Sequence, residues 1–118
     1  MNIEEARSLL LFEGSAPNGL VVATRLFEFP NVLRIEVLCE ALEQIFLHYK
    51  QIDQIERNIA SALFNISFQV QSNIEAAIEQ RVEVPERFIE DILIIYLMVE
   101  SIFENKWLVS DNEPNLTK

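Results

Sequence analysis

Residues 92–99 read ILIIYLMV, a run of eight apolar residues in a chain that is otherwise strongly acidic. A helix that spans a membrane needs about 20 predominantly apolar residues. This run is much shorter, and Glu90 and Asp91 precede it while Glu100 follows it. The run therefore predicts part of a helix that is buried in a core or offered to a partner, and it argues against a membrane segment.

The helix around this run begins near Pro85, because proline is favoured at the first helical position, and we expect it to reach about Asn105. Its apolar residues at helical spacing predict one broad core face, made by Phe88, Ile89, Ile92, Ile95, Tyr96, Val99, Ile102 and Phe103. The opposite arc carries Glu86, Glu90, Glu100 and Glu104, and Ile94, Leu97 and Met98 fall on that acidic arc. A single buried stripe does not require these last three side chains.

The rest of the chain also favours helices. Between Asn31 and Val84 there is no glycine or proline, whereas a β protein needs a turn every 8–12 residues or so. Asn2 and Glu5 have capping-box spacing, which predicts a helix over about 3–13 with Gly14 just past its end. The segment 20–29 is ambiguous between a short helix and a strand, and we favour the helix because a lone strand has nothing to pair with.

Asn31 is a suitable cap for a helix over about 32–50. Asp53 and Glu56 repeat the capping-box spacing, so a break near 50–53 is one reading and an unbroken helix is the other. From there an apolar pattern runs to Ile74, Ser72 offers a second restart, and residues 81–85 form a loop. The sum is an all-α, single-domain antiparallel bundle of four or five helices over 1–110, with a flexible C-terminal tail over 111–118.

The charge balance limits the partners. Nineteen acids stand against nine bases, which gives a net charge of −10. Such a chain repels a phosphate backbone and an anionic membrane surface, so we expect no nucleic-acid and no membrane partner. A basic protein partner is favoured by charge complementarity. Cys39 is the only cysteine and the N-terminus lacks the basic start of a signal peptide, so we expect a cytoplasmic protein.

The sequence carries no catalytic signature. His48 is the only histidine, and on one helix it points away from Cys39, nine residues earlier. No Glu-x-x-His pair, zinc spacing, calcium loop or glycine-rich phosphate loop occurs. We therefore expect no enzyme activity, no cofactor and no metal site.

In size, helical content, acidity and lack of catalytic motifs, the chain resembles the small acidic immunity proteins that neutralise toxin domains from neighbouring bacteria. This resemblance implies a non-catalytic module that binds a basic partner, such as a nuclease toxin domain. Its contacts would be carboxylates: Glu36, Glu40 and Glu43 on the helix over 32–50, and Glu86, Glu90, Asp91, Glu100 and Glu104 on the last helix.

Two other functions stay open. A homodimer or adaptor could associate through an apolar helix face made by Phe64, Phe68, Ile94, Leu97 and Met98. A small-molecule binder could instead use a cavity in the apolar core of the bundle.

Overall fold

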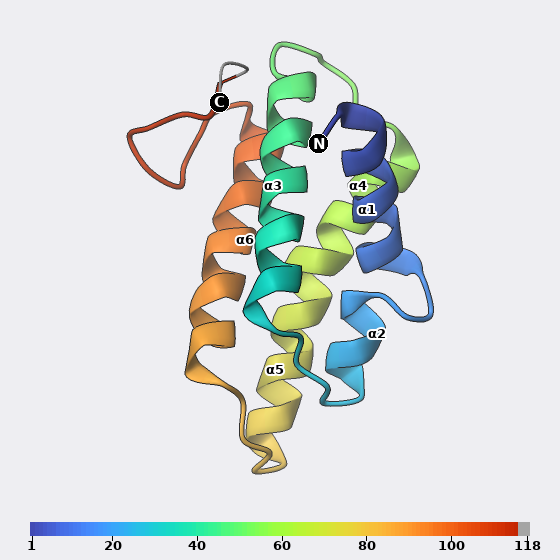
Figure 1. Ribbon diagram of the computed structural model, residues 1–118, viewed down its shortest axis with the longest axis vertical. Coiled ribbons are helices and arrows are strands. Elements are labelled where there is room, and N and C mark those ends of the chain that lie inside the picture. Colours follow the sequence, from blue (N-terminus) through green and yellow to red (C-terminus); the bar gives the residue numbers. More distant parts are fainter. Residues whose placement is uncertain (116–118) are drawn as a thin grey trace.

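The computed structural model describes residues 1–115, and within that range it contains helices and no strand. The three consecutive segments α4, η1 and α5 form one continuous rod, so the bundle consists of four long helices and the short α2 (Figure 1). The predicted all-α bundle of four or five helices is confirmed, and the strand alternative for 20–29 is wrong. The elements are α1 (Ile3–Ser15), α2 (Leu20–Arg25), α3 (Val32–Tyr49), α4 (Arg57–Phe64), the π-helix η1 (Asn65–Gln69), α5 (Val70–Glu79) and α6 (Glu86–Glu104).

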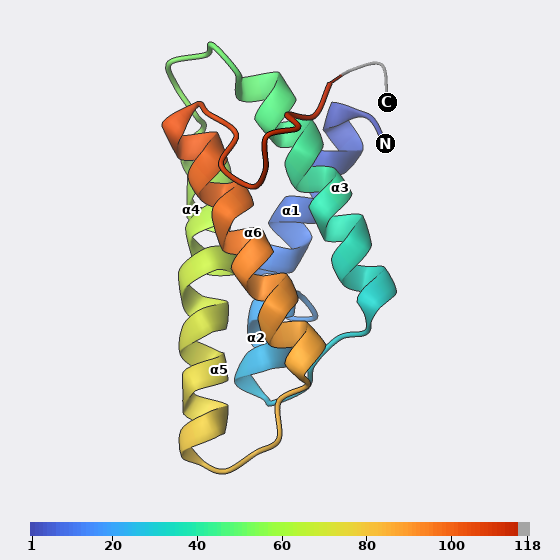
Figure 2. The same ribbon diagram turned by 90° about the vertical axis from the view of Figure 1, so that its left-hand side faces the viewer.

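The long helices run alternately down and up the molecule (Figures 1 and 2). α1 packs on α3 and α4, α6 packs on α3 and η1, and the short α2 covers part of α5. α6 therefore has two neighbours, one on each flank. Its remaining side is its outward side, and none of the helices formed by residues 1–115 covers it.

Local signals set several helix starts as the sequence predicts. The Asn2 side chain accepts a hydrogen bond from the Glu5 N–H, and the Glu5 carboxylate accepts one from the Asn2 N–H. Asn31 caps α3 by accepting from the Arg34 N–H. Pro85 occupies the position before the first helical residue of α6, one place earlier than predicted.

Three local signals mislead. The chain does break after α3, but α4 begins at Arg57 behind Glu56, and Asp53 lies in the loop. Ser72 lies inside α5, so no helix restarts there. Gly14 lies inside α1, where an added Cβ would come within 2.8 Å of the Ala62 Cβ. Its role is to let two helices approach closely, which its sequence neighbours cannot reveal.

The core runs the length of the bundle and joins all four long helices. The most completely buried large side chains of this core include Leu10, Leu38, Phe46, Leu63, Ile66 and Ile95.

None of the helices within residues 1–115 has the combination of length and apolar character that a membrane crossing requires.

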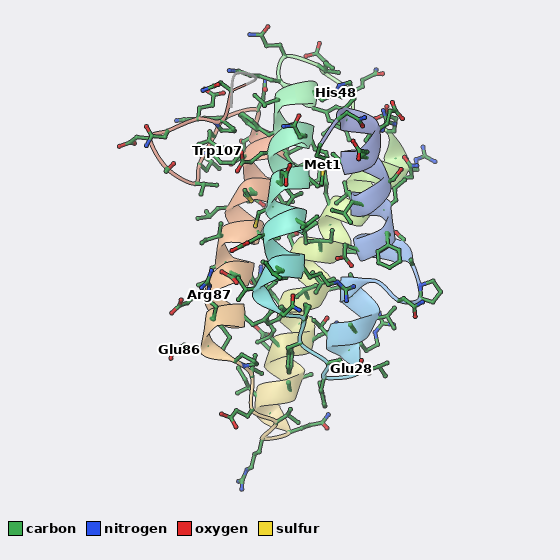
Figure 3. The ribbon with its side chains drawn as sticks, in the orientation of Figure 1. Met1, Glu28, His48, Glu86, Arg87 and Trp107 are labelled. Carbon is green, nitrogen blue, oxygen red and sulfur yellow. The ribbon has the colours of Figure 1, made fainter. Side chains whose placement is uncertain are left out.

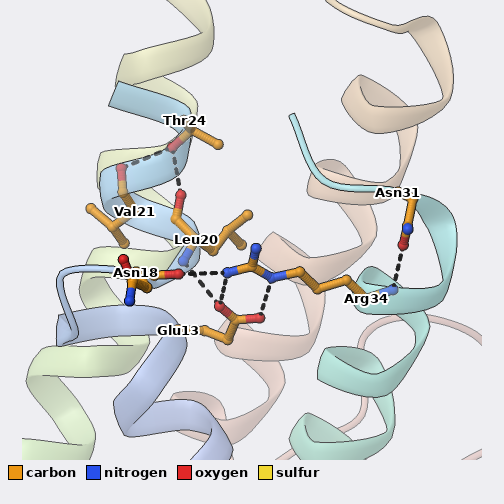
Figure 4. A network of polar contacts seen from close by, with 7 residues as sticks. All are labelled: Glu13, Asn18, Leu20, Val21, Thr24, Asn31 and Arg34. Carbon is orange, nitrogen blue, oxygen red and sulfur yellow. Dashed lines mark hydrogen bonds and ion pairs between the residues drawn. The ribbon is translucent and has the colours of Figure 1, made fainter. Parts of the chain in front are cut away.

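A buried acid ties the first three helices together. Glu13 is only 2% exposed, and its carboxylate accepts two hydrogen bonds from the Arg34 guanidinium, at 2.6 and 2.9 Å (Figure 4). The same carboxylate accepts the N–H of Leu20 at 3.0 Å, at the start of α2. The Arg34 guanidinium also donates to the carbonyl of Asn18. The pKa of Arg34 is raised, first by its hydrogen bonds to Glu13.

The chain after α6 folds back over the bundle instead of leaving it. Asn105 adopts a left-handed conformation and ends α6. The Trp107 ring then packs against Phe46 of α3, with ring centroids 5.0 Å apart, and Glu113 pairs with Lys50 at 2.6 Å. The predicted tail begins within this segment, and its residues 116–118 lie outside the described part of the chain.

Candidate protein-binding surface

The three predicted carboxylates of α3 share one strip of the helix, because they are spaced one turn apart along the regular helix Val32–Tyr49. Glu36 and Glu43 lie near Cys39, as does Asp91 of α6, while Glu40 lies 3.5 Å from the Met1 amino group. The pKa of the Cys39 thiol rises to about 11, mainly because the thiol is buried and further because of these three carboxylates. The seam between α3 and α6 therefore holds three carboxylates, with Arg87 beside two of them.

The predicted acidic strip on α6 divides between two flanks and an outward side. Asp91 faces α3, and its carboxylate accepts a hydrogen bond of 3.0 Å from Arg87. Glu100 follows nine residues later, half a helical turn around the axis, and lies against η1. Glu86, Glu90 and Glu104 are exposed on the outward side, and Figure 3 shows Glu86 projecting from the start of α6.

Apolar side chains lie among those outward carboxylates. Leu93 is 56% exposed, Ile94 42% and Leu97 36%. The sequence predicts Ile94 and Leu97 on the acidic arc, and both lie there. Leu93 is exposed beside them, although the sequence analysis does not assign it to that arc. We call this surface the outer α6 face, made by Glu86, Glu90, Leu93, Ile94, Leu97 and Glu104.

Met98 does not belong to the outer α6 face. It is 4% exposed, so its predicted place in an apolar interface is wrong. Met98 comes two turns after Asp91 on the same side of α6, the side that packs against α3. Met98 is therefore covered by parts of the chain outside α6, and these cannot be read from the sequence of α6 alone.

A groove runs between η1 and α6. Phe64 and Phe68 are about half exposed on one wall, and their rings stack at a centroid distance of 5.2 Å. Tyr96 and Phe103 form the other wall and are 40% and 46% exposed, so their predicted place in the core is wrong. We call this feature the aromatic groove; its volume is about 430 Å³ and its lining also includes Ser67, Gln71, Ser72, Glu75 and Glu100.

The π-helix shapes the wall of the groove that Phe64 and Phe68 form. Between Ile59 and Ile74 the buried positions need slightly more than the 3.6 residues per turn of an α-helix. The wide turn of η1 takes up this difference, keeps Ile66 and Val70 buried, and leaves Phe64 and Phe68 on the surface. A π turn is a rare feature that often marks a functional site, and no simple residue pattern announces it.

His48, which the sequence analysis considered for catalysis, lies outside both the outer α6 face and the aromatic groove. His48 is exposed near the end of α3, where its ring meets that of Tyr49 edge-on (Figure 3). Within residues 1–115, no three His, Cys, Asp or Glu side chains are grouped so that they could hold a metal ion. Comparisons of the chain with protein-family models, curated proteins and solved structures found no match.

Proposed function

We propose that the chain is a non-catalytic binding module whose outer α6 face binds a basic protein. The observation that carries this proposal is the arrangement of Leu93, Ile94 and Leu97 among the exposed carboxylates of Glu86, Glu90 and Glu104. An apolar centre with a polar rim is the usual composition of a protein-binding surface.

The charge of the rim defines the partner. A net charge of −10 and an acidic rim speed encounter with a positively charged surface and disfavour acidic partners. A nuclease domain is one partner of this kind, because its active site must attract phosphate. Carboxylates that occupy such a basic groove compete with nucleic acid, so neutralisation needs no chemistry from this chain. The proposed function is of the same kind as that of immunity proteins, which neutralise a toxin domain by binding it.

The test compares two triple charge reversals. A partner captured from source lysate is identified, purified and tested against Glu86→Lys, Glu90→Lys, Glu104→Lys combined in one variant. A control variant combines Glu28→Lys, Asp53→Lys and Glu79→Lys, three exposed acids elsewhere. Both variants have the same net charge, so a difference between them reports on the position of the acids.

We expect the first variant to associate more slowly than the control at low salt and to show a flatter salt dependence. Equal association rates for the two variants, or a captured partner without a basic surface, would remove the proposal.

Self-association is a second candidate, because Phe64, Phe68, Ile94 and Leu97 are all exposed. Sedimentation at micromolar concentration separates the two functions. A dimer that Leu97→Glu dissociates would favour a homo-oligomer, and a monomer would favour the heterologous partner.

A further inference from the structure

The aromatic groove combines ring surfaces with acid. Phe64 and Phe68 come from the end of α4 and from η1, and Tyr96 and Phe103 come from the facing side of α6. Two carboxylates, Glu75 and Glu100, complete the lining, and no described lining residue is basic. The groove therefore has a negative electrostatic character from two independent sources, since the faces of aromatic rings are also electron-rich.

Neither carboxylate is neutralised within the described chain. Other surface acids have cationic partners, as in the Arg87–Asp91 and Arg7–Glu56 pairs. The carboxylates of Glu75 and Glu100 take part in no ion pair or hydrogen bond among residues 1–115. Glu100 is also partly buried, so its charge is less screened by water than that of a fully exposed acid.

From this arrangement we propose that the aromatic groove receives an arginine side chain of the basic protein partner. The apolar stem of arginine lies along aromatic surface, and its planar guanidinium stacks on rings and pairs with carboxylates. Cation–π contact and an ion pair then act on the same group. This inference rests on the proposed function, because the arginine comes from the same basic partner.

The groove lies beside the outer α6 face, since Glu100 and Tyr96 belong to the same helix as Leu93 and Leu97. A smaller hollow lined by Ile74, Ile89 and Leu93 continues it toward the start of α6. A partner seated on the outer α6 face can therefore reach the groove with a side chain at the edge of the contact.

The test uses a defined probe. The ¹⁵N-labelled chain is titrated at low salt with a capped peptide of alternating arginine and glycine. The matched peptide carries citrulline in place of arginine, which preserves the shape and removes the charge. We expect amide shifts within 64–75 and 96–103 with the arginine peptide at millimolar concentration, and no such shifts with the citrulline peptide.

Substitutions assign the interaction to the groove. Phe68→Leu should weaken peptide binding about two- to fivefold, from the loss of a cation–π contact, and Glu100→Gln should weaken it by a similar factor. Phe12→Leu and Glu28→Gln are the controls, because both residues are exposed outside the groove, and they should leave binding unchanged. Thermal unfolding of each variant verifies that the fold is intact.

Three results overturn the inference. They are equal binding of the citrulline peptide, the absence of shifts at millimolar arginine peptide, and shifts confined to 86–104 with none within 64–75 while Phe68→Leu binds like wild type. The last result leaves the proposed function standing and removes only the groove. Conversely, failure of the charge-reversal test together with groove shifts removes the proposed function of the outer α6 face alone.

Discussion

Glu13 shows how a charge can be accommodated inside a small bundle. Its carboxylate is buried, but both oxygens accept hydrogen bonds from Arg34 and one also accepts the Leu20 N–H. Burying an acid is unfavourable unless such partners replace water. The sequence neighbours of Glu13 give no sign of Arg34, which is 21 residues away.

Glu13→Ala should therefore destabilise the fold. It leaves the Arg34 guanidinium and the Leu20 N–H without their acceptor, and we expect the free energy of unfolding to fall by about 2–4 kcal/mol. Urea denaturation followed by circular dichroism measures this change. Glu28→Ala, at an exposed site, should change it by less than about 0.5 kcal/mol, and equal effects of the two substitutions would contradict this account.

Cys39 reports both the burial and the negative charge of the seam between α3 and α6. Its raised pKa of about 11 leaves little thiolate at pH 8, and only the thiolate reacts with iodoacetamide. Alkylation of the native chain should be about a hundredfold slower than in concentrated urea, where the thiol has an ordinary pKa. The rate in the native state should rise as the pH approaches 11.

Asp91→Asn should lower the pKa of Cys39 and so speed alkylation at pH 8, because it removes the largest of the charge effects on the thiol. The gain should be modest, since burial is the main cause of the shift. Glu104→Gln, on the outer α6 face, is the control and should leave the rate unchanged. A native rate equal to the rate in urea would refute this description of the seam.

At the scale of elements, the sequence predicts what is local. Asn2 and Asn31 cap helices because a side-chain oxygen and a nearby N–H lie within three residues of one another. Whether Gly14 ends α1 or lets it cross α4 depends on Ala62, far along the chain. The same limit explains the misplacement of Tyr96, Met98 and Phe103, whose exposure is decided by which neighbour lies on each flank of α6.

Gly14→Ala tests this crossing by the sign of its effect. In an isolated helix the change would stabilise by up to about 1 kcal/mol. Here the new methyl group would meet Ala62 backbone atoms 2.9 Å away, so we expect the free energy of unfolding to fall by about 1–3 kcal/mol. Urea denaturation distinguishes the two signs, and a gain in stability would show that the helices can separate without loss.

At the scale of the whole molecule, excess negative charge opposes compactness. The chain carries a net charge of −10, and the compact fold holds these charges closer together than the unfolded chain does. The all-α class and the acidic character could be predicted from composition, whereas the two candidate binding surfaces could not be fully outlined. Their outlines depend on the packing order of the helices around α6.

Screening this repulsion should stabilise the fold. Raising sodium chloride from about 0.01 M to about 0.5 M shortens the range of charge interactions several-fold, so the urea midpoint should rise. The combined variant Glu28→Gln, Asp53→Asn, Glu79→Gln has a smaller net charge and should show a smaller rise. A midpoint that falls with salt would mean that the surface ion pairs outweigh the repulsion.

Trp107 gives the molecule a built-in optical reporter. It is the only tryptophan, and its ring rests on Phe46 while the Nε1 atom is buried with no hydrogen-bond partner among the described residues. An indole whose ring packs on another ring and whose Nε1 is removed from water emits at shorter wavelength than one in water. Intrinsic fluorescence will therefore register whether the segment after α6 is docked. Comparing it with circular dichroism would distinguish a detached segment from a melted bundle without any added dye.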